Sequence, residues 1–152
     1  MSAIRIGNAS GFYGDRFAAM QEMLTGGELD YLTGDYLAEL TMLILGRDRL
    51  KDSTLGYAKT FLRQMETNLG TAMDRGVKIV SNAGGVNPAG LAEALTRLAG
   101  ELGLSPSIAY VDGDDLTASA ADLGLGTPLT ANAYLGGFGI AAALQAGADI
   151  VV

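Results

Sequence analysis

Residues 77–95 read VKIVSNAGGVNPAGLAEAL, and this stretch joins a strand to a helix through one tight turn. VKIVS is rich in β-branched residues, which is typical of a buried strand. Small residues follow in the turn NAGGV, and Asn87 and Pro88 then mark the start of a helix. Asn is a preferred N-cap, and Pro suits the first helical position because no N–H is needed there. The stretch therefore predicts a βα unit with Asn87 as the cap.

The same alternation extends outward in both directions from this unit. Apolar runs predict further strands at residues 3–9, 29–33, 108–111 and 148–152. Helical periodicity predicts helices at residues 15–24, 36–51, 55–74, 88–102 and 134–146, with a loop at residues 124–128. This alternation indicates an α/β fold in one domain over residues 1–152. We expect an open, mostly parallel, Rossmann-like sheet of about five strands with helices on both faces.

Composition excludes several classes of protein. The 152 residues are 49% hydrophobic and 18% charged with 22 glycines, which rules out disordered and fibrous classes. A net charge of −7 disfavours nucleic acid and anionic membrane surfaces as partners. No apolar run approaches the roughly 18 residues of a membrane span, and residues 1–8 lack a basic start and a long apolar region. We therefore expect a cytoplasmic protein.

The sequence contains no Cys and no His. Disulfides, thiolate nucleophiles, Cys-based zinc sites and His-based acid–base catalysis are therefore excluded. Any chemistry must use carboxylates, Lys or Arg, Tyr, hydroxyls, amides and backbone dipoles. The basic residues Arg47, Arg49 and Lys51, and likewise Lys59 and Arg63, are interpreted as solvated helix faces.

Polar residues gather where the predicted strands end, which is where open parallel sheets bind ligands. The candidates for binding an anion or another ligand are Asn8, Ser10, Gly11, Asn82, Gly84, Gly85, Asn87 and Asn132. Small residues in the turn at 82–88 allow a ligand close to the backbone, and the following helix directs N–H groups at it. A phosphate or a carboxylate fits that description. The alternative is a well-capped turn without a ligand.

Carboxylates and one tyrosine supply the candidates for catalysis and metal binding. Asp112 and Asp114 are candidate Mg²⁺ ligands, and Asp35, Asp115 and Tyr134 are candidate catalytic residues. The alternative for the aspartates at 112–115 is a solvated turn and helix cap. The segment GFGIAA at residues 137–142 matches the dinucleotide pattern G-x-G-x-x-A, but such a segment at a helix start more often reflects close packing of the helix on the sheet.

Several of these junctions resemble one known family. The resemblance rests on RIGNASGFYGDRF (5–17), LDYLTGDYLAELTM (29–42), GYAKTFLRQ (56–64), KIVSNAGGVNPAGLAEAL (78–95), DGDDL (112–116) and TANAYLGGFGIAAAL (130–144). Together they are similar to the N-terminal region of the acyclic terpene utilization (AtuA-type) family. The resemblance implies a role in bacterial breakdown of citronellol- and geraniol-like compounds through acyl-CoA intermediates.

What the resemblance implies leaves two hypotheses open. The first is an enzyme acting on an acyl-CoA or a branched acid, with a coenzyme A thioester or Mg²⁺ as candidate cofactor. The second is a non-catalytic ligand-binding or assembly module of a larger complex. In both, the ligand is a small acyl or carboxylate molecule. Members of the family are usually longer, so we expect an N-terminal part of a longer protein, and the apolar residues 148–152 favour a homo-oligomer.

Overall fold

The computed structural model describes residues 3–152 and contains one five-stranded parallel sheet. The strands are β1 (Ile6–Asn8), β2 (Tyr31–Gly34), β3 (Lys78–Ser81), β4 (Ile108–Ala109) and β5 (Ile150–Val151). Their order across the sheet is β1-β2-β3-β5-β4, and every pairing is parallel. The predicted α/β class with an open parallel sheet is confirmed. All five carboxyl ends consequently lie at one edge.

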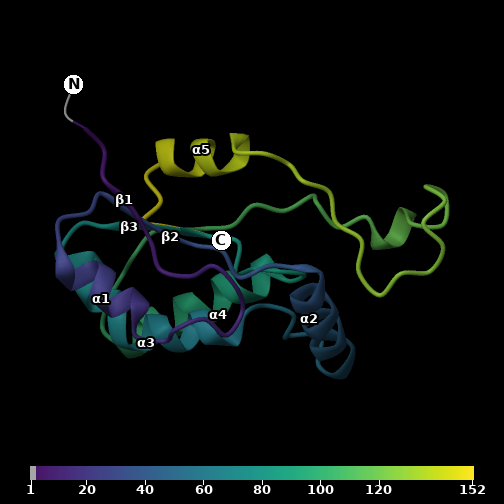
Figure 1. The fold of residues 1–152 in the computed structure, drawn as a ribbon, viewed down its shortest axis with the longest axis horizontal. Helices are drawn as coiled ribbons and strands as arrows, with labels where there is room; N and C mark the ends of the chain where they lie inside the picture. The colour runs from purple at the N-terminus through teal and green to yellow at the C-terminus, as the bar shows by residue number, and fades with distance from the viewer. Residues whose placement is uncertain (1–2) are drawn as a thin grey trace.

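Helices cover the two faces of the sheet unequally. They are α1 (Ala19–Gly26), α2 (Glu39–Lys51), α3 (Lys59–Asp74), α4 (Pro88–Glu101) and α5 (Phe138–Gln145), with a 3₁₀ turn, η1 (Thr117–Ser119). Figure 1 shows α1, α3 and α4 along one face and α5 alone on the other, with α2 at the side. Within residues 3–152, no helix has the length and apolar character required to cross a bilayer.

The core lies between the sheet and the layer of α1, α3 and α4. Leu32, Ile79 and Ile150 project into it from three neighbouring strands and are at most 2% exposed. They meet helical residues spaced three or four apart, namely Phe61, Met65 and Leu69 of α3 and Leu91, Leu95 and Leu98 of α4. Burying each such side chain stabilises the fold by roughly 1.5–3 kcal/mol. This layer therefore fixes β3 and α4, the two elements on either side of the decisive turn.

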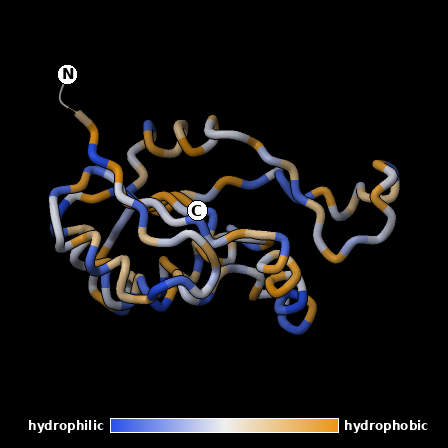
Figure 2. Tube along the Cα trace, viewed as in Figure 1, coloured by the Kyte–Doolittle hydropathy of each residue, from blue (hydrophilic) through white to orange (hydrophobic). Residues whose placement is uncertain are grey.

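The other face is thinly covered, because no residue of α5 is buried. The tube in Figure 2 shows α5 standing apart from the helical layer, and its sequence FGIAAALQ is apolar apart from glycine and the final Gln145. Its closest approach to the sheet side uses Gly139, where a Cβ atom would lie 2.7 Å from Val111 Cγ1. Residues 137–142 therefore agree with the interpretation that their glycines allow close packing of a helix on the sheet.

Several element boundaries differ from the predicted ones. The strand expected at residues 3–9 contains only Ile6–Asn8, and four helices begin three or four residues later than expected, at Ala19, Glu39, Lys59 and Phe138. Hydrogen bonds explain two of these delays, one local and one to a residue distant in the sequence. Asp15 accepts from the N–H groups of Gly11 and Arg16, and the Tyr36 N–H donates to Asn82 Oδ1 instead of opening a helix.

Between β4 and α5 the chain forms an arm, residues 112–137, that extends beyond the helical layer (Figure 1). Its two limbs meet in an antiparallel bridge between Asp115 and Asn132. The Leu116 N–H donates to Ala131 O at 2.7 Å, and the Ala133 N–H donates to Asp114 O at 2.8 Å. These bonds hold the two limbs of the arm together at its base.

We predict that Gly85→Ala destabilises the protein by about 2 kcal/mol or more, because φ is +56° and a Cβ would lie 2.8 Å from the Gly56 carbonyl oxygen. Gly70→Ala is the matched control: it lies inside α3 with nothing within 4 Å, so it should stabilise by about 0.5–1 kcal/mol. Urea denaturation measures both. Equal effects of the two substitutions would contradict the packing described for the turn.

Candidate functional site

The turn between β3 and α4 is capped as the sequence predicted. Asn87 Oδ1 accepts a hydrogen bond from the Gly90 N–H at 3.0 Å, which is the N-cap interaction. Its Nδ2 donates to the carbonyl oxygens of Thr54 at 3.2 Å and Leu55 at 3.0 Å. The Asn87 side chain therefore fixes the start of α4 and also ties it to the connection between α2 and α3.

Most N–H groups of this turn are used within the protein. The Gly85 N–H donates to Asn82 O, the Val86 N–H to Gly56 O and the Asn87 N–H to Gly84 O. The turn also packs tightly, because a Cβ at Gly84 would lie 2.8 Å from Pro88 Cα. An anion bound here would find few backbone donors. The local geometry is thus the one expected of the ligand-free capped turn.

A cavity of about 190 Å³ lies between this turn, the C-terminal half of α2 and the base of the arm. Its lining includes six predicted site residues: Gly85, Asn87, Asp112, Asp114, Asp115 and Asn132. Because these residues come from three separate chain segments, their meeting supports the expectation of a shared site at the carboxyl edge. Arg49 also lines the cavity and was not among the predicted site residues.

Arg49 connects the walls of the cavity. Its Nη1 donates to the Val86 carbonyl oxygen at 2.6 Å and lies 3.4 Å from Asp115 Oδ2. The side chain is 45% exposed, so part of the guanidinium faces the cavity and solvent. Sequence interpretation treated Arg49 as part of a solvated helix face. The structure agrees that the residue is exposed and adds that it contacts this cavity. The only sequence signal was its place near the end of an apolar helix.

Asp115 is held as a carboxylate. Hydrogen bonds from Thr117, and more weakly the bond and charge of Arg49, lower the pKa of Asp115 below the ordinary aspartate value. The Thr117 N–H donates to Asp115 Oδ1 at 2.9 Å. A general acid needs a raised pKa to carry a proton near neutral pH. In this arrangement Asp115 instead orients Arg49 and balances its charge.

Neighbouring carboxylates also have protein partners. Asp114 Oδ2 accepts from Asn132 Nδ2 at 2.9 Å, which joins the two limbs of the arm across the cavity wall. Asp112 lines the same cavity. Among residues 3–152, no group of three or more Asp and Glu side chains has an arrangement that would hold a metal ion. Binding of Mg²⁺ by Asp112 and Asp114 stays a prediction, and these two carboxylates are its proposed ligands.

The remaining predicted residues near the first three strands form a separate hydrogen-bonded cluster. Asn82 Nδ2 donates to Asp35 Oδ1 at 2.7 Å, so the ends of β2 and β3 are linked. Asn8 Nδ2 donates to Ser10 O at 3.0 Å, and the Gly11 N–H donates to Asp15 Oδ2 at 2.9 Å. None of Asn8, Ser10, Gly11, Asp35 and Asn82 is among the residues lining the cavity.

Tyr134 stands apart from both groups. Its side chain is fully exposed in the segment that precedes α5, and it does not line the cavity. The structure thus divides the predicted site residues into an edge cavity, a cluster at the first three strand ends, and this exposed tyrosine. Gly84 belongs to none of the three, because it packs against Pro88 inside the turn.

Tyr36 is a buried titratable group between the cluster and the core. It is 2% exposed, its ring packs edge-on against Phe61 with centroids 5.5 Å apart, and its hydroxyl is hydrogen-bonded to Gln64 Oε1. Burial raises the pKa of Tyr36 to about 12, because the phenolate would be poorly solvated. Tyr36 therefore stays neutral at physiological pH.

Comparison with known proteins identifies one family. The model of a family described as acyclic terpene utilisation family protein AtuA matches residues 4–152. Comparisons with curated proteins and with solved structures give no match.

The buried tyrosine predicts how stability responds to alkali. The folded pKa of Tyr36 lies above the unfolded value near 10, so its contribution is complete below pH about 10 and is lost as pH rises toward 12. The loss should approach about 1.4 kcal/mol per pH unit in that window. Urea denaturation between pH 9 and about 11.5 measures this slope.

Tyr36→Phe should flatten the slope while lowering stability at pH 7, because buried Gln64 Oε1 loses its donor. Tyr110→Phe, at a tyrosine that is 47% exposed, is the control and should keep the wild-type slope. An unchanged alkaline slope in Tyr36→Phe would show that another group is responsible.

Proposed function

The chain belongs to the acyclic terpene utilisation family AtuA, and on that premise we propose that it binds a carboxylate or acyl intermediate of acyclic terpene breakdown. The proposed binding site is the edge cavity between the β3–α4 turn and the arm. A role in acyclic terpene utilisation follows from the family. The side chains that line the cavity support the ligand class and the site.

Arg49 is the observation that carries the proposal. It is the one cationic residue in the cavity lining. Among the described residues, its Nη1 alone donates hydrogen bonds, to Val86 O and Asp115 Oδ2, which leaves donors of the planar guanidinium for a ligand. Such donors match a carboxylate in a two-bond arrangement. Because Val86 and Asp115 hold the group in place, little side-chain freedom is lost on binding.

The size of the cavity limits what it holds. At about 190 Å³ it is smaller than the roughly 300–1,000 Å³ of pockets that enclose a drug-sized ligand. It therefore takes the polar end of a molecule, while a hydrocarbon chain extends outside. The three aspartates of the lining oppose any anion, and they oppose a multiply charged polyphosphate more strongly than a single carboxylate. A coenzyme A thioester would therefore place its uncharged acyl end here and not its nucleotide.

The same contacts favour binding over proton transfer at this site. Asp115 is held as a carboxylate, Asp114 is bonded to Asn132, and the predicted catalytic residues Asp35 and Tyr134 lie outside the lining. These observations favour the hypothesis of a ligand-binding module. An enzymatic role for Asp35 or Tyr134 would require a second site at the cluster or at the exposed segment.

We predict that Arg49→Gln weakens binding of citronellic acid, the carboxylic acid related to citronellol, by at least about tenfold, equivalent to about 1.4 kcal/mol. Isothermal titration calorimetry gives the affinity, and a thermal melt verifies folding because Arg49 also holds Val86. Arg49→Lys keeps the charge without the planar donors, so its affinity for the acid should lie between those of the wild type and Arg49→Gln. Citronellol itself, which lacks the carboxylate, should bind more weakly than the acid.

Arg63→Gln is the matched control, since it removes the same charge from an exposed position on α3 outside the cavity. It should bind the acid as the wild type does. Equal affinities of wild type, Arg49→Gln and Arg63→Gln would remove Arg49 from the site and with it the proposal.

A further inference from the structure

Helix α2 has a second apolar face that the rest of the protein covers only in part. On one side Thr41 and Leu45 are buried against the body. On the opposite side four apolar residues recur at helical spacing and are exposed: Leu40 (67%), Leu43 (38%), Ile44 (36%) and Leu50 (76%). Isolated exposed leucines are common, but a stripe along one helix face is typical of a contact surface. We call this stripe the outer face of α2.

The outer face is also charged in a defined order. Arg47 lies within it, one turn beyond Leu43, and Lys51 lies one turn beyond Arg47. Glu39 begins the helix and is its acidic residue in the first turn. A partner of this face must therefore offer apolar surface, acidic groups opposite the C-terminal half of α2 and tolerance for an acidic group at its N-terminal end.

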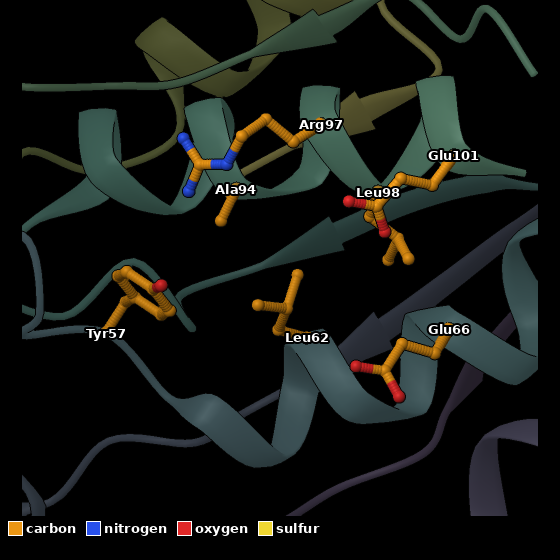
Figure 3. A pocket seen from close by; sticks show the side chains of 7 residues that line it. All are labelled: Tyr57, Leu62, Glu66, Ala94, Arg97, Leu98 and Glu101. Atoms are coloured by element: carbon orange, nitrogen blue, oxygen red, sulfur yellow. The ribbon is translucent and has the colours of Figure 1, made fainter.

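Such a surface exists on the same protein, in the groove between α3 and α4 shown in Figure 3. Its volume is about 190 Å³, and Leu62, Ala94 and Leu98 form its apolar floor. Figure 3 shows Glu66 and Glu101 on opposite walls at one end, with their carboxylates turned toward the groove.

The other end of the groove carries the opposite charge. Arg97 lies there, with its guanidinium directed toward Tyr57 (Figure 3). None of the ion pairs found among residues 3–152 involves Glu66, Glu101 or Arg97. These charged groups are therefore available to a partner.

We propose that the outer face of α2 docks into the α3–α4 groove of a second copy of this chain. The N-terminal end of α2 lies toward Tyr57 and Arg97, which places Glu39 near Arg97 and Arg47 between Glu66 and Glu101. Glu39 to Arg47 spans about 12 Å of helix and Arg97 to Glu101 about 6 Å, and the Arg97 side chain extends away from Glu101 (Figure 3), which closes part of the difference. Leu43 and Leu50 then face the apolar floor.

Charge decides between this arrangement and direct pairing of two α2 helices. Antiparallel pairing about a two-fold axis that places Leu40 opposite the second Leu50 brings the two Arg47 side chains within about one helical turn of each other in an apolar seam. Glu39 lies opposite Lys51 in that register, so no carboxylate faces Arg47 directly. Two like charges there are unfavourable unless they are neutralised. The groove supplies carboxylates for Arg47 instead. The contact uses two different surfaces, so it repeats from copy to copy.

Sedimentation equilibrium of the purified chain tests this, over about a hundredfold range of concentration and at about 0.05 M and 0.5 M salt. We expect the wild-type mass to rise with concentration and to fall with salt. Arg47→Glu should be monomeric, and so should the double variant Glu66→Lys with Glu101→Lys. Asp122→Lys, an exposed charge change of the same size in the arm, should associate as the wild type does.

Mixing Arg47→Glu with the double variant Glu66→Lys, Glu101→Lys is the decisive experiment. An equimolar mixture should associate, because the acidic outer face of Arg47→Glu matches the basic groove of the double variant, and the unmodified face and groove match as well. A misfolded variant would not regain association in this way. The proposal is overturned if the wild type stays monomeric, if Arg47→Glu associates normally, or if the mixture stays monomeric. It does not depend on the ligand of the edge cavity.

Discussion

The position of the β3–α4 turn depends on two backbone hydrogen bonds to the segment between α2 and α3. The Val86 N–H donates to Gly56 O at 2.9 Å, and the Ala58 N–H donates to Ala83 O at 2.8 Å. Gly85 allows Leu45 to pack directly over the turn. Since α4 begins at the end of this turn and the edge cavity opens beside it, both would shift if these bonds were lost. The main role of the turn is therefore to connect β3 and α4 to the segment between α2 and α3, and not to bind a ligand.

This junction changes how the site works chemically. A glycine-rich turn before a helix usually offers N–H groups to an anion. Here the protein itself accepts those bonds, and the cationic group at the cavity is the guanidinium of Arg49, whose hold on Val86 O belongs to the same junction. The positive charge facing the cavity therefore comes from a side chain, which is why a single carboxylate suits this cavity better than a phosphate chain.

Local signals in the sequence predicted the fold, whereas contacts distant in the sequence decided the site. The strand and the N-cap at residues 77–95 depend on near neighbours, and the structure confirms them, whereas the turn between them is also held by Gly56 and Ala58. The late start of α2 depends on a bond from Tyr36 to Asn82, 46 residues away. Arg49 reaches Asp115 across 66 residues. Helical periodicity does not carry that information, so Arg49 was interpreted as a solvated residue.

The most direct test of this account is amide hydrogen exchange at the turn, followed by NMR at the amides of Gly85, Val86 and Asn87. If their bonds to Asn82, Gly56 and Gly84 close the turn, these amides should exchange within about tenfold of the rate of the β3 amides, with or without added citronellic acid. Exchange as fast as that of an exposed loop, slowed only when the acid is added, would contradict the account. It would indicate that the backbone N–H groups of the turn bind the ligand.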